Sequence, residues 1–205
     1  MNPPLPPRIV LASQNAKKAR ELQGLLAPLG CEVLPLSQFT DVAPDETAPT
    51  FIENALIKAR HASRISGLPA IADDSGLEVA ALNGSPGVYS ARYAGEPSSD
   101  AANNAKLLQA LAGVPDAERG ARFISALAWL RHADDPVPLL AVGQWPGRIL
   151  HAPRGEGGFG YDPLFLDLQL GRSAAELSAE EKGRVSHRGR ALRSLLRQLA
   201  PDHAA

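Results

Sequence analysis

Short apolar runs alternate with helical repeats along the first part of this chain, and this alternation restricts the fold more than any other feature. The run Arg8–Ala12 (RIVLA) has the length and composition of a buried strand. A polar loop and helically spaced apolar residues lead from it to Gly30, and a second run covers 32–36. This order predicts an α/β fold. The loop also places backbone N–H groups at a helix N-terminus, where anions bind readily.

A second helix is predicted after Thr50, because Thr50 and Glu53 have the spacing of a capping box. Its expected buried stripe consists of Ile52, Ala55, Leu56, Ala59 and Ala62. The later predicted elements are a helix from Asp100, strands over 122–130, 137–144 and 148–150, and a closing helix over 191–199. We expect one domain over 1–205, with a flexible Pro-rich arm over 1–7.

Two adjacent carboxylates follow the third apolar run, Ala70-Ile-Ala-Asp73-Asp74-Ser75-Gly76. Adjacent like charges repel each other and are costly to bury. Asp, Ser and Gly all favour turns, so a solvated turn after the strand is one interpretation. In open α/β sheets, however, ligands bind beyond the carboxyl ends of strands. The position of the pair therefore favours a functional site.

The composition excludes several classes of protein. Apolar residues make up 44% and charged residues 21% of the chain, as in ordinary globular proteins. With 21 basic and 22 acidic residues, the chain lacks the basic excess of a nucleic-acid coat. The single cysteine, Cys31, allows no internal disulfide and fits a reducing compartment. Neither a secretory signal nor a membrane span is recognisable, so we expect a cytoplasmic protein without membrane or nucleic-acid partners.

Acidic and basic clusters together indicate a metal–nucleotide site. Carboxylates of the kind that hold a hard cation such as Mg²⁺ occur at Asp45, Glu46, Asp73 and Asp74. Donors that suit phosphate or carbonyl oxygens occur at Lys17, Lys18 and in the basic stretch 182–190. The structural alternative for the basic stretch is a solvated helix entry.

A glycine-rich run over 154–163 (RGEGGFGYDP) formally contains G-x-G-x-x-G. A dinucleotide fingerprint requires a helix directly afterwards, but Tyr161-Asp162-Pro163 follows, so the match is weak. The glycines permit close approach of the backbone to a ligand, and Phe159 or Tyr161 offers a flat apolar face. A glycine-rich hairpin with a core aromatic is the alternative.

Six short motifs stand in a specific order along nearly the whole chain. They read SQNAKK (13–18), TFIENA (50–55), ADDSGL (72–77), PGVYSARY (86–93), GFGYDP (158–163) and SHR (186–188). Each is weak alone, but the ordered set resembles the inosine/xanthosine triphosphate pyrophosphatase family, which removes deaminated purine nucleotides from the nucleotide pool. One departure is Gln14, where that family commonly has Gly.

The resemblance implies a mixed α/β sheet in two lobes with a central substrate cleft, a homodimer and dependence on Mg²⁺. It implies a hydrolase, a nucleoside-triphosphate diphosphatase that converts ITP, dITP or XTP to the monophosphate and pyrophosphate. Asp74 would be the catalytic carboxylate and a metal ligand. Either Asp45 or Glu46 would be a further metal ligand, and the sequence leaves that choice open.

The resemblance also implies a set of substrate contacts. Residues 13–18 would bind the triphosphate, 159–162 would enclose the base and sugar, and the basic stretch would contact the base region. The implied substrate-binding residues are Ser13, Gln14, Asn15, Ala16, Lys17, Lys18, Ser75, Phe159, Gly160, Tyr161, Asp162, Lys182, His187 and Arg188.

Two other functional classes stay open at this point. A serine hydrolase could use Ser75, His187 and an aspartate, although Ser75 lacks the G-x-S-x-G setting of such nucleophiles. A nucleotide sensor without catalytic activity would share the binding residues. Release of pyrophosphate distinguishes the enzyme from the sensor.

Overall fold

The computed structural model describes residues 6–13, 20, 23–24 and 30–199. Its strands are β1 (Arg8–Ala12), β2 (Glu32–Pro35), β3 (Ala70–Val79), β4 (Gly120–Leu130), β5 (Leu139–Ile149), β6 (Phe165–Asp167) and β7 (Arg172–Ser173). Its α-helices are α2 (Phe51–Ser66), α3 (Asp100–Ala110), α4 (Ala179–Val185) and α5 (His187–Leu199). Short 3₁₀ helices cover η2 (Leu36–Gln38), η3 (Ala80–Leu82), η4 (Gly87–Arg92), η5 (Asp116–Glu118) and η6 (Ala174–Glu176).

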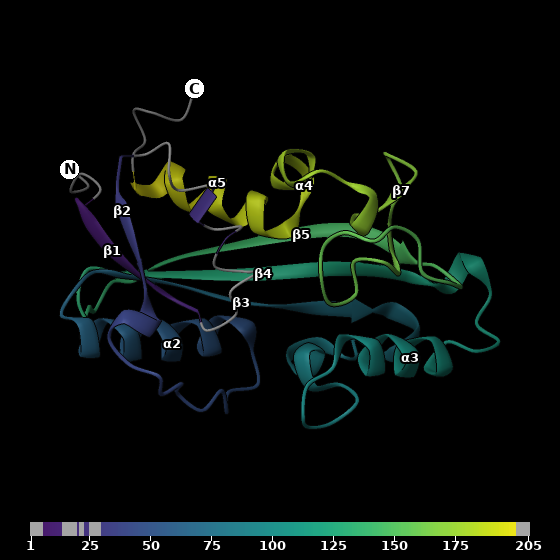
Figure 1. Ribbon diagram of the computed structural model, residues 1–205, viewed down its shortest axis with the longest axis horizontal. Helices are drawn as coiled ribbons and strands as arrows, with labels where there is room; N and C mark the ends of the chain where they lie inside the picture. Colours follow the sequence, from purple (N-terminus) through teal and green to yellow (C-terminus); the bar gives the residue numbers. More distant parts are fainter. Residues whose placement is uncertain (1–5, 14–19, 21–22, 25–29, 200–205) are drawn as a thin grey trace. The chain divides into compact units, whose positions relative to one another are not determined.

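The strands form a seven-stranded sheet in the order β2-β1-β3-β4-β5-β6-β7 (Figure 1). β1 pairs in parallel with both β2 and β3, whereas β6 pairs antiparallel with β5 and β7. The sheet is therefore mixed, and the predicted α/β class is confirmed. The chain divides into two compact units, Met1–Asp74 with Ser125–Gly143 and Arg188–Ala205, and Ser75–Ile124 with Gln144–His187.

In the first unit a helix covers each face of the sheet, with α2 on one face and α5 on the other (Figure 1). Alternate residues of β4 enter the two cores: Leu127 and Trp129 pack on the α5 side, and Ala128 and Leu130 pack on the α2 side. This division follows from the two-residue period of a strand. Burial on both faces explains the continuous apolar run of β1.

The helix α2 is predicted correctly in position but only partly in its buried stripe. The Thr50 hydroxyl accepts a hydrogen bond from the Glu53 N–H and caps the helix. Ala55, Ala59 and Ala62 are fully buried, as expected, whereas Leu56 is only half-buried. Ile52 is 37% exposed, so its predicted burial is wrong. In the first turn of α2 the buried residues are Phe51 and Asn54, so the buried stripe does not include Ile52.

The second unit has its own core, centred on aromatic side chains. Phe123 and Phe165 pack with ring centroids 4.5 Å apart, and Leu107 of α3 is fully buried in the same core. The buried Arg119 joins the end of α3 to the end of β5, since its guanidinium donates to the carbonyls of Leu111 and Ile149. The second unit thus holds α3 firmly against the strands.

The strands β3 and β5 continue well beyond the ends that the sequence predicts. β3 continues from Ala70 through the Asp pair to Val79, so the turn considered at Ser75-Gly76 is wrong. β5 extends to Ile149 and includes most of the separate strand predicted over 148–150. The first predicted helix lies largely outside the described residues, as does most of the arm over 1–7. Among the helices that the structure describes, none combines the length and apolar character needed to cross a membrane.

Candidate active site

The Asp pair of β3 points its two side chains to opposite faces of the strand, because successive residues alternate. Asp73 lies on the same face of β3 as Ile71, which packs on the α5 side. Asp74 lies on the same face as Ala72, which packs on the α2 side. The pairing of β1 with β3 ends at Ala12 and Ala72. The pair therefore lies directly beyond the carboxyl end of β1, which is the position that open α/β sheets use for ligands.

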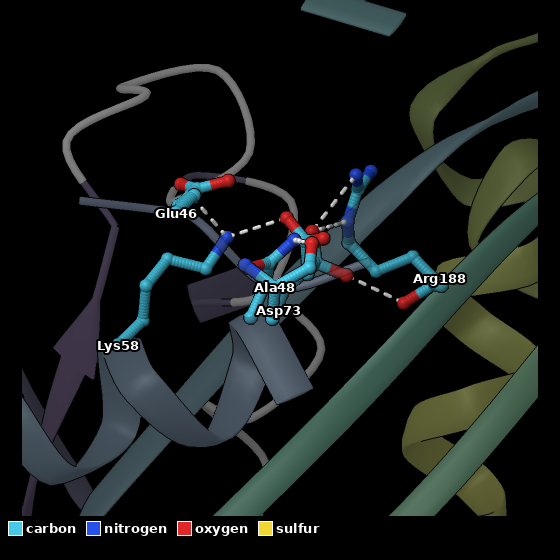
Figure 2. A network of polar contacts seen from close by, with 8 residues as sticks. Glu46, Ala48, Lys58, Asp73 and Arg188 are labelled. Atoms are coloured by element: carbon cyan, nitrogen blue, oxygen red, sulfur yellow. Dashed lines mark hydrogen bonds and ion pairs between the residues drawn. The ribbon is translucent and has the colours of Figure 1, made fainter. Parts of the chain in front are cut away.

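Asp73 has internal partners that compensate its charge. The residue is 2% exposed, and its carboxylate accepts a hydrogen bond from Ser125 Oγ at 2.5 Å. Arg188 of α5, also 2% exposed, places Nη2 3.3 Å and Nε 3.4 Å from Asp73 Oδ2 (Figure 2). A buried ion pair of this kind is costly to break, because either partner alone would be an uncompensated charge. The pair ties α5 to β3.

Asp74 and Glu46 converge on a third residue, Lys58 of α2. The Lys58 Nζ lies 2.6 Å from Asp74 Oδ1 and 3.2 Å from Glu46 Oε1, and Figure 2 shows Lys58 reaching toward Glu46. Burial opposes the charge of Lys58, but the nearby carboxylates of Asp74 and Glu46 outweigh it and raise the pKa of Lys58. A positive charge thus occupies the place where the two carboxylates meet.

The sequence prediction missed Lys58 as a site residue. Lys58 lies beside Ala59, at the border of a stripe lined by alanines, where packing does not require a long side chain. A long basic side chain at this position was the available signal of a site residue. The sequence prediction also left open whether Asp45 or Glu46 is a metal ligand. The structure places Glu46 beside Lys58 and leaves Asp45 exposed.

The buried Asn54 fixes the acidic loop to α2. Its side-chain oxygen accepts from the Ala48 N–H at 3.0 Å, and its Nδ2 donates to the Ala48 carbonyl at 3.1 Å. Asn54 thus holds both the N–H and the carbonyl of Ala48, which lies two positions after Glu46. This anchor determines where the loop presents the Glu46 carboxylate.

A second grouping of predicted residues lies in the second unit. Asp162 is 3% exposed, and its Oδ2 accepts from the Phe159 N–H at 2.8 Å and from Lys182 Nζ at 2.6 Å. The same Nζ lies 4.9 Å from the centroid of the Phe159 ring, within the range of a cation–π contact. The structure therefore brings Phe159, Asp162 and Lys182 together.

The glycine-rich run also serves packing within the chain. A Cβ on Gly155 or Gly157 would approach the Ala175 backbone to 2.8 Å, so these glycines allow close contact between backbone segments. Tyr161 is 4% exposed and its hydroxyl donates to the Ser90 carbonyl at 2.8 Å. Burial raises the pKa of this phenol, with smaller contributions from Tyr93 and Asp100. The core-aromatic alternative is thus correct for Tyr161, whereas Phe159 is only half-buried.

His187 is held by stacking. Its ring lies 4.8 Å from the Phe123 ring with an interplanar angle of 16°, and the residue is 4% exposed. Ser75 is half-buried within β3 and does not follow a sharp strand-to-helix turn, so the serine-hydrolase alternative lacks its nucleophile elbow.

The predicted triphosphate loop is largely beyond what the structure describes. Ser13 is half-buried, and its N–H donates to the Leu11 carbonyl at 2.9 Å. The predicted contacts of Gln14, Asn15, Ala16, Lys17 and Lys18 fall outside the described residues and stay predictions.

Comparison with known proteins identifies the family of this chain. Residues 9–198 match the model of the Ham1 family. The chain belongs to the Ham1 family. The resemblance inferred from the sequence is thus confirmed.

Relatives of this Ham1 chain match over almost their whole length. A dITP/XTP pyrophosphatase from Aromatoleum aromaticum is 63% identical over 193 residues, covering 94% of this chain and 96% of the relative. A dITP/XTP pyrophosphatase from Pseudomonas aeruginosa is 58% identical over 191 residues, covering 93% and 95%. The solved structure of a HAM1 protein from Coxiella burnetii has a TM-score of 0.87 at 48% identity, covering 95% of this chain and 98% of that one.

Proposed function

We propose that this Ham1-family protein is a nucleoside-triphosphate pyrophosphatase that hydrolyses the deaminated purine nucleotides ITP, dITP and XTP. The products would be the nucleoside monophosphate and pyrophosphate. The observation that carries the proposal is the meeting of Asp74 and Glu46 at one cationic centre, Lys58, beyond the carboxyl end of β1. Relatives at 63% and 58% identity that are dITP/XTP pyrophosphatases support this choice of reaction.

Mg²⁺ is the cation that we propose for this reaction, with Asp74 and Glu46 as its protein ligands. The donor set suits Mg²⁺ because both ligands are carboxylates. The Lys58 ammonium, which contacts both of them, shows that a positive charge is accommodated where they meet. Among the residues that the structure describes, no group of three or more His, Cys, Asp or Glu could hold a metal ion. Mg²⁺ commonly takes only one or two carboxylates and completes its shell with substrate phosphates and water.

When bound, the ion would neutralise phosphate charge and make the attacking water more acidic. Asp74 would accept the proton of that water as general base. Lys58 would hold the Asp74 carboxylate in place through its 2.6 Å contact. We assign Asp74 to the chemistry because it shares the Lys58 ammonium with a second carboxylate, Glu46. Asp73 instead accepts hydrogen bonds from Arg188 and Ser125.

The base would be recognised by residues that donate hydrogen bonds. Hypoxanthine and xanthine carry a carbonyl at C6, where adenine carries an amino group. Lys182 and His187 can donate to a carbonyl but would meet another donor in adenine. A buried donor left unsatisfied costs about 1–3 kcal/mol, which is enough to disfavour ATP. Arg188 would contribute in the same way, in addition to its contact with Asp73.

The proposal includes a homodimer that acts in the cytoplasm. The expected particle has about twice the chain mass of 21.6 kDa. Sedimentation at micromolar concentration tests the assembly, and a fully active monomer would remove the dimer from the proposal.

The decisive assay is pyrophosphate release from ITP, dITP, XTP, GTP and ATP, each with and without Mg²⁺. We expect release from ITP, dITP and XTP well above GTP, with ATP poorest and little turnover without metal. Tight binding of ITP without pyrophosphate release would instead identify a nucleotide sensor. Hydrolysis that releases only inorganic phosphate would contradict the proposed bond cleavage.

A further inference from the structure

Two side chains of α3 hold both backbone groups of Gly160, within the loop that also carries Phe159 and Asp162. Asp100 Oδ2 accepts a hydrogen bond from the Gly160 N–H at 2.9 Å. Asn104 Nδ2 donates to the Gly160 carbonyl at 2.8 Å. Their spacing of four residues places both side chains on one face of the helix. One helical turn thus fixes the two peptide groups that flank the Gly160 Cα.

The helix that carries these side chains is itself firmly anchored. Ser99 caps it by accepting from the Ala102 N–H, and Leu107 is fully buried. The buried Asn103 accepts from the Ala94 N–H at 2.7 Å and donates to the Ala91 carbonyl at 2.9 Å. Since α3 is held by a core and by a second loop, it is a rigid support for Gly160.

Gly160 depends on these contacts from α3 because it has no side chain that could anchor its own backbone. Gly160 has φ of +60°, and a Cβ there would find nothing within 4 Å. Its chain neighbour Phe159 carries the ring over which Lys182 lies, at 4.9 Å. A displacement of the Gly160 peptide would therefore displace that ring and change its relation to Lys182.

We propose that Asp100 and Asn104 are positioning residues for purine recognition. They act through Gly160 to hold Phe159 and Lys182 where the base is read, and so they set the discrimination between 6-oxo purines and adenine. The inference rests on the proposed function, since it requires that the loop over 159–162 contacts a purine nucleotide.

The test measures kcat and KM for pyrophosphate release from ITP and from ATP in Asp100→Ala and Asn104→Ala. Each loses one hydrogen bond to the loop, so we expect the KM for ITP to rise about tenfold and the ITP:ATP ratio of kcat/KM to fall about tenfold. We expect kcat to change far less than KM. Gln109→Ala, which shortens an exposed amide on the same helix, is the matched control and should change neither constant.

Conservative variants separate positioning from a general loss of structure. Asp100→Asn keeps an oxygen that can accept from the Gly160 N–H, so it should restore most of the discrimination lost in Asp100→Ala. Asn104→Asp loses its donor and sets a carboxylate against the Gly160 carbonyl, so it should be at least as harmful as Asn104→Ala. This opposite response of two isosteric exchanges is also informative if an alanine variant fails to fold. An unchanged ITP:ATP ratio in all folded variants would overturn the inference.

Failure of the proposed function gives a different result. In that case the wild-type protein releases no pyrophosphate, and calorimetric binding of inosine monophosphate, which needs no turnover, replaces the kinetic readout. About tenfold weaker binding by Asp100→Ala and Asn104→Ala, with binding by Gln109→Ala unchanged, would still support the positioning role. Equal binding by all variants, or no binding by the wild type, would overturn it.

Discussion

The Lys58 ammonium lies 2.6 Å from a carboxylate oxygen of Asp74, and both side chains are largely buried. The pair joins α2 to β3 and places a positive charge beside the carboxylate that we assign to the chemistry. Since Glu46 approaches the same ammonium at 3.2 Å, two negative charges share one positive neighbour. This arrangement leads to the first two predictions.

Asp74→Asn should nearly abolish turnover of ITP while the fold survives. The amide oxygen can still accept from Lys58, but it cannot take a proton from water. Loss of a general base typically lowers the rate by about 10²–10⁴-fold, and loss of a metal ligand adds to this. Pyrophosphate release and circular dichroism measure the two effects. A folded variant with near wild-type kcat would show that Asp74 has no part in the chemistry.

Glu46→Gln should raise the Mg²⁺ concentration needed for half-maximal activity by about tenfold, corresponding to about 1.4 kcal/mol of lost binding. Asp45→Asn is the matched control, because Asp45 is the exposed neighbour in the same loop. Binding of Mn²⁺ to the free protein, measured by electron paramagnetic resonance, provides a readout that does not depend on turnover. The assignment fails if Asp45→Asn shows the larger effect.

Arg188→Ala should lower the free energy of unfolding by about 3–5 kcal/mol, because it leaves the Asp73 carboxylate buried without its guanidinium. The double variant Asp73→Asn/Arg188→Met should recover part of this loss, since it removes both charges. Urea unfolding measures both variants and the wild type. Should Arg188→Ala keep wild-type stability and lose only its preference for ITP over ATP, base recognition would be the main role of Arg188.

Gly158→Ala should harm the protein more than Gly160→Ala. Both glycines have positive φ, +72° and +60°, so each alanine carries a strain of about 1–2 kcal/mol. A Cβ at Gly158 would also overlap the Asp162 carboxylate, whereas one at Gly160 meets open space. Only Gly158→Ala should displace Asp162 from Phe159 and Lys182 and raise the KM for ITP. Equal KM values for the two variants would contradict this account.

The stability of the protein should depend on Glu181 at acidic pH. The Glu181 carboxylate accepts hydrogen bonds from the Arg172 guanidinium and from the Ser178 N–H. These hydrogen bonds lower the pKa of Glu181 from 4.5 to about 2. A folded-state pKa below the unfolded value stabilises the protein above the unfolded pKa and loses this effect as pH falls through the folded one. The stability difference between wild type and Glu181→Gln should therefore be constant above about pH 5 and shrink between about pH 4.5 and pH 2. Urea unfolding across this range measures it, and a pH-independent difference would contradict the contact.

Several features were predictable from the sequence because they depend on neighbouring residues. The apolar run of β1, the Thr50 cap and the alanine stripe of α2 follow from local periodicity and capping chemistry. The order of the six motifs was sufficient to indicate the family to which the chain belongs. The prediction that the Asp pair ends its own strand is wrong, because β3 continues to Val79 and the strand that ends beside the pair is β1.

Only the tertiary structure decided which side chains the carboxylates contact. Asp73 and Asp74 are adjacent in the sequence, yet strand alternation sends one toward α5 and the other toward α2, where Arg188 and Lys58 compensate them. Arg188 is 115 residues from Asp73 along the chain, and no local pattern specifies such a partner. The placement of Glu46, and not Asp45, beside Lys58 likewise depends on how Asn54 anchors the loop at Ala48. Local residue patterns determine which helices and strands form. The packing of distant segments determines which charged side chains contact each other in the site.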